Sequence, residues 1–138
     1  MVAMTEMSIE YLDEKDVVIR IRNRFPGEAD RTDAWLRERG WDDLNEVPYV
    51  WIEAFADRTS DAVRLADWNM VIEHTKFLAA EYRKGSDAVR KLVDVAYAEN
   101  LMWNLGAEDK TAGWPNIAKE VRALYEKTWG AREWMHRN

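Results

Sequence analysis

Three carboxylates in the middle of the chain stand at helical spacing. Glu53, Asp57 and Asp61 follow one another at intervals of four residues. Residues four apart lie on one face of an α-helix, so these side chains would form an acidic row whose like charges destabilise the helix. Arg58, Arg64, a neighbouring helix or a basic partner would offset this repulsion. The row is therefore a candidate surface for a basic partner, with a solvated acidic face as the alternative.

A tryptophan and further acids precede this row. Trp41 is followed directly by Asp42 and Asp43, and Glu46 comes three residues after them. Indoles near helix ends either cover the edge of a core or anchor a binding partner. An exposed indole among acids would suit a basic protein surface. The predicted partner-binding residues are Trp41, Asp42, Asp43, Glu46, Glu53, Asp57 and Asp61.

A second group of polar residues falls on apolar helix faces. His74 lies at the edge of an apolar stripe, and Glu99 and Asn100 share a helix side with hydrophobic residues. A carboxylate buried in such a place must be paired or protonated. These three residues fit either hydrogen bonds between helices or a polar groove that holds a small ligand or substrate.

Residues that commonly act as nucleophiles or metal ligands are scarce in this chain. The chain has no cysteine, so disulfides, thiolate catalysis and cysteine metal sites are excluded. It has only two histidines, without the repeated Glu-x-x-His of a di-iron bundle, and no Gly-x-Ser-x-Gly or Gly-x-Gly motif. We therefore expect no catalytic residues, no metal, no cofactor and no enzymatic activity.

Residues that start and end helices divide the chain into the elements that must position these side chains. The apolar spacing predicts an all-α bundle of about six helices, with stacked helix pairs as one arrangement. For the first segment a helix is favoured over a strand, although Val17–Arg22 ends in strand-like alternation. The helices are expected over 8–24, 29–39, 47–64, 68–84, 87–105 and 115–129. We expect a single domain over 1–138, with 131–138 as a tail or helix extension.

Single residues mark the ends of these helices and the core. Asp67 and Ser86 are predicted N-caps, and Pro48 and Pro115 are predicted to open helices. Left-handed C-cap positions are expected at Gly40, Gly85, Gly106 and Gly130. Core positions are expected for Trp51, Trp68 and Trp129, and positions at core edges or binding surfaces for Trp41, Trp114 and Trp134.

The net charge of −6 concentrates in one part of the chain. Residues 40–69 carry seven acids but only two arginines. An acidic protein repels phosphate backbones, so direct nucleic-acid binding is disfavoured and a basic protein partner is favoured. Neither an apolar run of membrane-spanning length nor a signal peptide is evident, so we expect no membrane association and a cytoplasmic location.

The stretch from Val47 to Gly130 resembles a family of small helical bacterial proteins associated with polymorphic-toxin and contact-dependent-inhibition immunity. The segments that carry the resemblance are Val47–Trp51, Lys84–Asp87, Leu105–Gly106 and Tyr125–Gly130, with Phe25–Pro26 near the end of the first helix. The resemblance implies an inhibitor that binds a toxin domain rather than an enzyme. It implies no individual binding residues.

Three functions follow as hypotheses. The leading one is an immunity-type protein that neutralises a cognate, basic toxin domain through acidic and aromatic surface complementarity. The first alternative is a small helical enzyme or ligand binder with a groove near His74, Glu99 and Asn100. The second is a regulator or scaffold that forms a homodimer through exposed aromatic residues. The sequence leaves the oligomeric state and the identity of the partner open.

Overall fold

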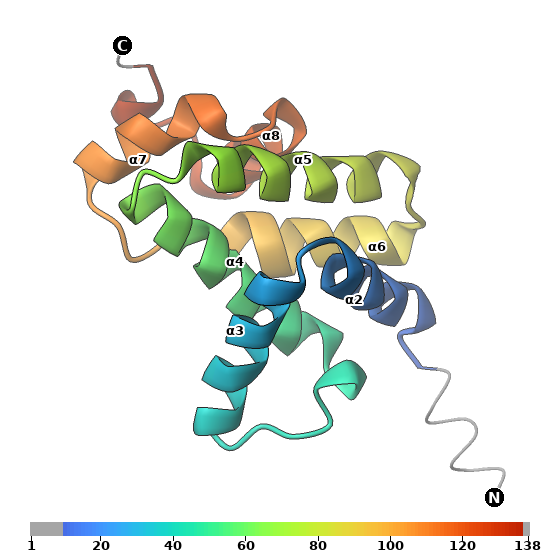
Figure 1. Ribbon diagram of the computed structural model, residues 1–138. Coiled ribbons are helices and arrows are strands. Elements are labelled where there is room, and N and C mark those ends of the chain that lie inside the picture. Colours follow the sequence, from blue (N-terminus) through green and yellow to red (C-terminus); the bar gives the residue numbers. More distant parts are fainter. Residues whose placement is uncertain (1–9, 137–138) are drawn as a thin grey trace, which may run out of the picture.

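The computed structural model describes residues 10–136, and all regular elements in that range are helical (Figure 1). This confirms the all-α prediction. The elements in chain order are α2 (Leu12–Arg24), α3 (Pro26–Glu38), η1 (Leu44–Glu46), α4 (Pro48–Arg64), α5 (Trp68–Lys84), α6 (Asp87–Lys91), η2 (Leu92–Tyr97), η3 (Ala98–Asn100), α7 (Ala107–Gly113), η4 (Trp114–Asn116), α8 (Lys119–Trp129) and η5 (Glu133–His136). Residues 8 and 9 of the expected first helix lie outside the described residues.

The first described element, α2, is a helix and not a strand, which confirms the preferred prediction for this segment. Val17, Val18 and Ile21 are buried on one side of α2, while Ile19 is exposed. Burial at positions i, i+1 and i+4 is a helical pattern, and it outweighs the strand preference of the β-branched residues. The helix ends at Phe25 because Pro26 disfavours helical geometry in the residue before it, and Pro26 itself opens α3.

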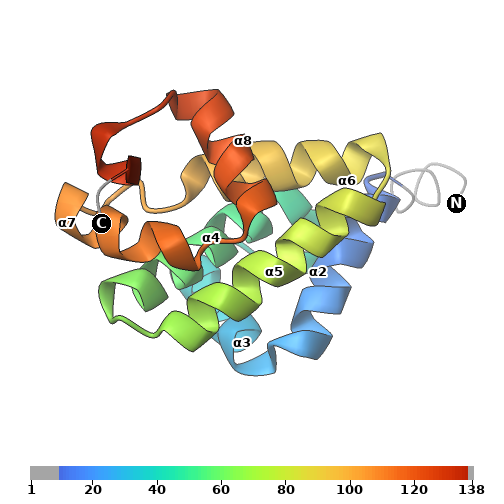
Figure 2. The same ribbon diagram turned by 90° about the horizontal axis from the view of Figure 1, so that it is seen from above.

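Helix α4 runs through the middle of the molecule. Figure 1 shows α5 above it and α3 below it, and α4 packs against both. Seen from above, α6 and α8 lie alongside α5 (Figure 2). Trp51, Ile52 and Phe55 of α4 are fully buried, and the Trp51 and Phe55 rings stack at 5.6 Å. Because its apolar side chains fill the core, only the outer face of α4 is free to carry charged residues.

A buried carboxylate ties three helices together in this core. Asp33 of α3 accepts a hydrogen bond of 2.8 Å from the indole Nε1 of Trp51 and two bonds, of 2.7 and 2.8 Å, from the Arg22 guanidinium. Burial alone would raise the pKa of Asp33, but the bonds from Arg22 and Trp51 hold it below its ordinary value. The network fixes α3 against α4, and so positions the outer residues of both helices.

The helix expected over 87–105 is broken in the structure. α6 ends at Lys91 and continues as a π-helical segment, η2, and a short 3₁₀ segment, η3, which ends at Asn100. The Asn100 amide donates to the carbonyls of Val95 and Ala96, at 3.2 and 2.8 Å, and so satisfies groups that a continuing α-helix would have used. Met102 then adopts φ 57°, and Trp103 projects with 62% of its surface exposed.

The C-terminal elements also differ from the prediction. α7 was not expected, because apart from Gly113 none of its residues is buried and the segment lacks an apolar stripe. Pro115 lies in η4 and does not open α8. Trp129 is 42% exposed rather than in the core. The following chain packs back: the Trp134 ring lies edge-on to the rings of Trp114 and Tyr125, and Met135 is buried.

The expected helix boundaries are confirmed in part. The side chains of Asp67 and Ser86 cap α5 and α6, and Pro48 opens α4. Gly40 and Gly130 have positive φ, as expected, but Gly106 does not. Gly85 has φ −83°, and a Cβ there would lie 2.6 Å from the Glu81 carbonyl oxygen and 2.5 Å from Val89 Cγ1. Close approach, not left-handed backbone, therefore requires glycine at this position.

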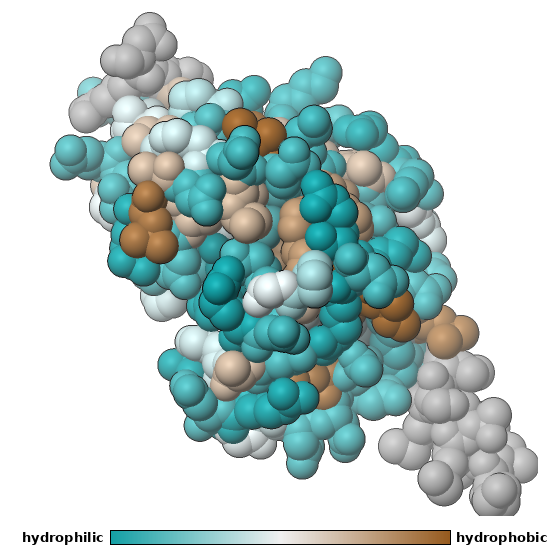
Figure 3. Space-filling view, viewed as in Figure 1, coloured by the Kyte–Doolittle hydropathy of each residue, from teal (hydrophilic) through white to brown (hydrophobic). Residues whose placement is uncertain are grey.

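Hydrophilic residues cover most of the face seen in Figure 3, and the hydrophobic residues on it are scattered. Within residues 10–136, none of the helices has the length and apolar composition needed to cross a lipid bilayer.

The tryptophans differ in how far they match their predicted burial. The predicted core position is confirmed for Trp51, which is fully buried, and in part for Trp68, which is half-buried. Trp114, expected at an edge, is only 8% exposed.

Candidate functional site

A groove of about 330 Å³ lies between the end of α3, the outer face of α4 and the turn that follows η3. It is hereafter the tryptophan groove. Its walls carry three indoles and two carboxylates, Trp35, Trp41, Trp103, Glu53 and Asp57. Leu36, Arg39, Val50, Ala54 and Asn100 complete the lining.

The end of α3 determines where Trp41 lies. Gly40 has φ 88°, its N–H donates to the carbonyl of Arg37 at 3.0 Å, and the N–H of Trp41 donates to the carbonyl of Leu36 at 3.1 Å. These two bonds are those of a Schellman motif, which reverses the chain at a helix C-terminus. The reversal brings Trp41 back beside Leu36, so that both residues line the groove.

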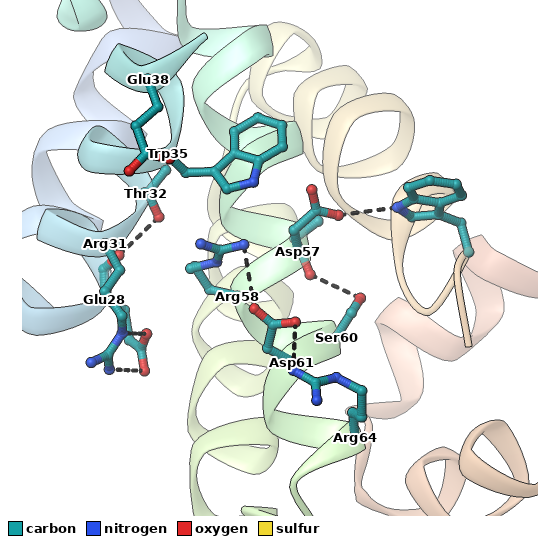
Figure 4. A network of polar contacts seen from close by, with 12 residues as sticks. Glu28, Arg31, Thr32, Trp35, Glu38, Asp57, Arg58, Ser60, Asp61 and Arg64 are labelled. Carbon is teal, nitrogen blue, oxygen red and sulfur yellow. Dashed lines mark hydrogen bonds and ion pairs between the residues drawn. The ribbon is translucent and has the colours of Figure 1, made fainter. Parts of the chain in front are cut away.

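Glu53 and Asp57 stand one turn apart on the outer face of α4. Among the described residues neither carboxylate is in an ion pair, and Asp57 accepts a hydrogen bond of 3.1 Å from the indole nitrogen of Trp103 (Figure 4). Burial, with the negative charge of the neighbouring Asp57, raises the pKa of Glu53. Burial likewise raises the pKa of Asp57, despite the bond from Trp103. A cation placed between them would relieve this unfavourable electrostatic environment.

Arg39 shows that this groove accommodates a cation. Its guanidinium carbon lies 3.6 Å from the centroid of the Trp35 ring, and its Nη1 donates to the Trp35 carbonyl at 3.0 Å. Its ion pair with Glu38 is long, at 3.8 Å. A guanidinium over an indole face is a favourable cation–π arrangement. The groove thus already holds one cation, Arg39, whose charge with that of Arg58 lowers the pKa of Asp57 only in part. Glu53 and Asp57 form no ion pair with it or with any other described residue.

The third member of the acidic row has a different role. Asp61 pairs with Arg58 at 3.3 Å and with Arg64 at 3.4 Å (Figure 4). Of the possible offsets named from the sequence, Arg58 and Arg64 act on one member of the row, Asp61. They leave Glu53 and Asp57 without an ion pair of their own in the described part of the chain. The row is thus divided into a paired end and an open end.

The remaining predicted acids lie outside the groove. Glu46, in η1, pairs with Lys15 of α2. Asp42 and Asp43 are exposed in the connection between α3 and η1, where Asp43 has φ 47°. Of the seven predicted partner-binding residues, the structure brings Trp41, Glu53 and Asp57 together in one groove.

The predicted polar group around His74 is not assembled. The His74 ring is fully buried, its Nδ1 lies 2.9 Å from Thr59 Oγ1, and the same hydroxyl lies 2.9 Å from the Tyr97 hydroxyl. Burial lowers the pKa of His74 to about 4. Asn100 lines the tryptophan groove, and Glu99 is half-exposed on η3. The structure therefore does not join these three residues in one groove, because His74 faces the core.

Besides three aliphatic residues, Trp35, Arg39 and Trp103 were not identified from the sequence as groove residues. Trp35 and Arg39 stand four residues apart in an expected helix. Side chains at this spacing are neighbours, so the sequence could have predicted their cation–π contact. Trp103 had no local signal, because its position depends on the end of η3. Within residues 10–136, no cluster of three or more His, Cys, Asp or Glu side chains could hold a metal ion.

No curated protein and no solved structure matches the chain. A family model described as "Domain of unknown function (DUF7674)" matches residues 18–131, a range that includes every residue of the tryptophan groove. The description gives no partner or activity. The chain belongs to the DUF7674 family.

Proposed function

We propose that this protein is a binding module that holds a basic side chain of a partner protein in the tryptophan groove. One observation carries the proposal. Glu53 and Asp57, two carboxylates without an ion pair among the described residues, share a groove with the indoles of Trp35, Trp41 and Trp103. Lysine and arginine side chains combine the positive charge and the apolar stem that such walls favour.

The energetics support a side chain rather than a simple inorganic cation. A cation over an indole gains on the order of 0.5–1 kcal/mol at exposed sites and about 2 kcal/mol when desolvated. The carboxylates add charge-assisted hydrogen bonds, which are stronger than neutral ones. Tryptophan and arginine are also the residues most often found at the energetic centre of protein interfaces.

The overall charge favours the same class of partner. The chain carries a net charge of −6, and complementary charge accelerates the encounter of two proteins and excludes partners of like charge. A cognate toxin domain that is basic because it binds nucleic acid is one partner of this chemistry. In that form the protein is a cytoplasmic, immunity-type inhibitor, as expected from the resemblance of Val47–Gly130.

A nuclear magnetic resonance titration tests the proposal. The chain has eight tryptophans, each with an indole N–H that gives a separate signal in a ¹⁵N spectrum. The probes are two acetylated, amidated pentapeptides with a single lysine or a single glutamate among glycines. The lysine peptide is expected to shift the indole signals of Trp35, Trp41 and Trp103 saturably, and the glutamate peptide to leave those of Trp35 and Trp41 unchanged. Equal responses to both peptides, or none, would rule out a cation-selective groove.

A further inference from the structure

A second groove, of about 280 Å³, lies between α7, α8 and the chain after α8. It is hereafter the basic groove. Its lining consists of Trp103, Lys110, Tyr125, Trp129, Arg132 and Trp134. Trp103 also lines the tryptophan groove, so one indole forms part of both walls. The two grooves are neighbours and carry opposite charge.

In the described part of the chain, the cations of the basic groove have no acidic partner. Among residues 10–136, neither Lys110 nor Arg132 forms an ion pair with a carboxylate. Lys110 Nζ lies 5.8 Å from the centroid of the Trp134 ring, and Arg132 Nε donates to the Trp129 carbonyl at 3.0 Å. Two positive charges therefore border an aromatic surface, and no described carboxylate neutralises them.

The aromatic walls are held in place by contacts of their own. The indole nitrogen of Trp129 donates to the Glu99 carbonyl at 3.0 Å. The rings of Tyr125 and Trp134 meet edge-on with centroids 5.8 Å apart. Fixed aromatic walls lower the entropy cost of binding, because fewer side chains must be ordered by the ligand.

We infer that the basic groove holds a carboxylate side chain from the same partner segment whose cation occupies the tryptophan groove. This inference rests on the proposed function. The partner would present a basic and an acidic side chain, one on each side of Trp103. Because one indole forms a wall of each groove, the two grooves adjoin, and one short segment that crosses Trp103 can enter both.

Two observations favour a protein carboxylate over a phosphate group. The net charge of −6 repels polyanions, and a phosphate is more highly charged than a carboxylate. The groove also offers long side chains and indoles as walls, which suit the apolar stem of a glutamate.

The test compares four probes in the same indole ¹⁵N spectrum. They are the lysine peptide, the glutamate peptide, a series of peptides with both residues separated by one to four glycines, and inorganic phosphate. At one spacing the two-residue peptide is expected to bind about tenfold more tightly than the lysine peptide, because the second contact becomes intramolecular. It should shift the signals of Trp129 and Trp134 in addition to those of Trp35 and Trp41.

Substitutions assign this gain to the basic groove. The double variant Lys110→Gln with Arg132→Gln should remove the gain and leave binding of the lysine peptide unchanged. A control with the same change in charge, Lys76→Gln with Lys119→Gln, alters two exposed lysines outside the groove and should keep the gain. An intact wild-type indole spectrum in each variant shows that the fold is retained.

The outcomes separate the two hypotheses. If no two-residue peptide binds more tightly than the lysine peptide, the second site is wrong while the proposed function stands. If the glutamate peptide shifts Trp129 and Trp134 but the lysine peptide shifts nothing, the proposed function fails and the basic groove is supported by itself. A stronger response of Trp129 and Trp134 to inorganic phosphate than to the glutamate peptide overturns the assignment to a protein carboxylate.

Discussion

The indole nitrogen of Trp103 donates a hydrogen bond of 3.1 Å to Asp57 Oδ1, and so joins the turn after η3 to the outer face of α4. With 62% of its surface exposed, Trp103 has little burial to hold it there. The hydrogen bond thus keeps the indole between the tryptophan groove and the basic groove. Both grooves depend on one polar contact between segments far apart in the sequence.

Replacing Trp103 by phenylalanine tests this contact. Phe retains an aromatic ring but cannot donate to Asp57, so we expect weaker binding in both grooves. Stability should change by less than about 1 kcal/mol, because the side chain is largely exposed. The lysine and glutamate peptides, titrated into the variant, measure the effect. Trp68→Phe, outside both grooves, is the control, and wild-type affinities in Trp103→Phe would show that the bond has no role in binding.

Glu53→Gln is expected to stabilise the fold and to weaken binding of the lysine peptide. The folded protein raises the pKa of Glu53, so it disfavours the charged form that is present at pH 7. Because Glu53 is exposed, solvent screens most of this effect, and the gain should be only a few tenths of a kcal/mol. It should vanish as the pH falls and the carboxyl becomes protonated in both states. Urea unfolding at pH 7 and pH 4 measures it.

A comparison variant tests whether the gain in stability and the loss of peptide binding are specific to Glu53. Asp30→Asn removes an exposed carboxylate of α3 that lies outside the groove. It should neither stabilise the fold to the same extent nor weaken peptide binding. A Glu53→Gln protein that is less stable than wild type at pH 7 would contradict the assignment of Glu53 as a strained, ligand-directed carboxylate.

The buried His74 should make the fold sensitive to acid. Its pKa is lowered from 6.5 to about 4, so the unfolded chain binds a proton more readily than the folded one. Its contribution to stability is complete above pH 6.5 and is lost as the pH falls towards 4, by about 3 kcal/mol at most. Glu53 and Asp57 act in the opposite direction, so the difference between wild type and His74→Gln is the quantity to follow. If the free energies of unfolding of the two proteins changed in parallel from pH 7 to pH 4, His74 would not be a source of the acid sensitivity.

Gly85→Ala should destabilise the fold by about 2 kcal/mol, the usual range for inserting a methyl group into packed surroundings. A Cβ at Gly85 would meet the Glu81 carbonyl and the Val89 side chain. Gly27→Ala is the matched control, because nothing lies within 4 Å of a Cβ there and Gly27 is inside α3. It should stabilise the fold by about 0.5 kcal/mol through helix propensity. Equal thermal midpoints for the two variants would refute the packing argument.

Periodicity in the sequence was sufficient to predict most of the helices. The bounds expected for α5 match the structure, and Asp67 caps it as predicted, because cap and stripe are local signals. The break after Asn100 and the course of α7 were not predictable in this way. They follow from the π-helical turn and from packing of the C-terminal chain, both of which depend on residues distant in the sequence.

The candidate site was predicted only in part for the same reason. Helical spacing identified Glu53 and Asp57, and the acidic loop identified Trp41. The division of the acidic row could not be predicted, because Arg58 turns to Asp61 in the folded protein. Trp103 joins the site only through its bond to Asp57, which links residues 46 positions apart.

The dissociation constant of the lysine peptide tests the central claim most directly. It is measured by calorimetry for wild type, for Glu53→Gln with Asp57→Asn, and for Asp16→Asn with Asp30→Asn, which carries the same net charge on exposed residues outside the groove. An Asn at position 57 can still accept the bond from Trp103. We predict about tenfold weaker binding, on the order of 1.4 kcal/mol, for the groove variant only. Equal affinities in the two variants, or no saturable binding to wild type, would contradict the assignment of the tryptophan groove as a cation-binding site.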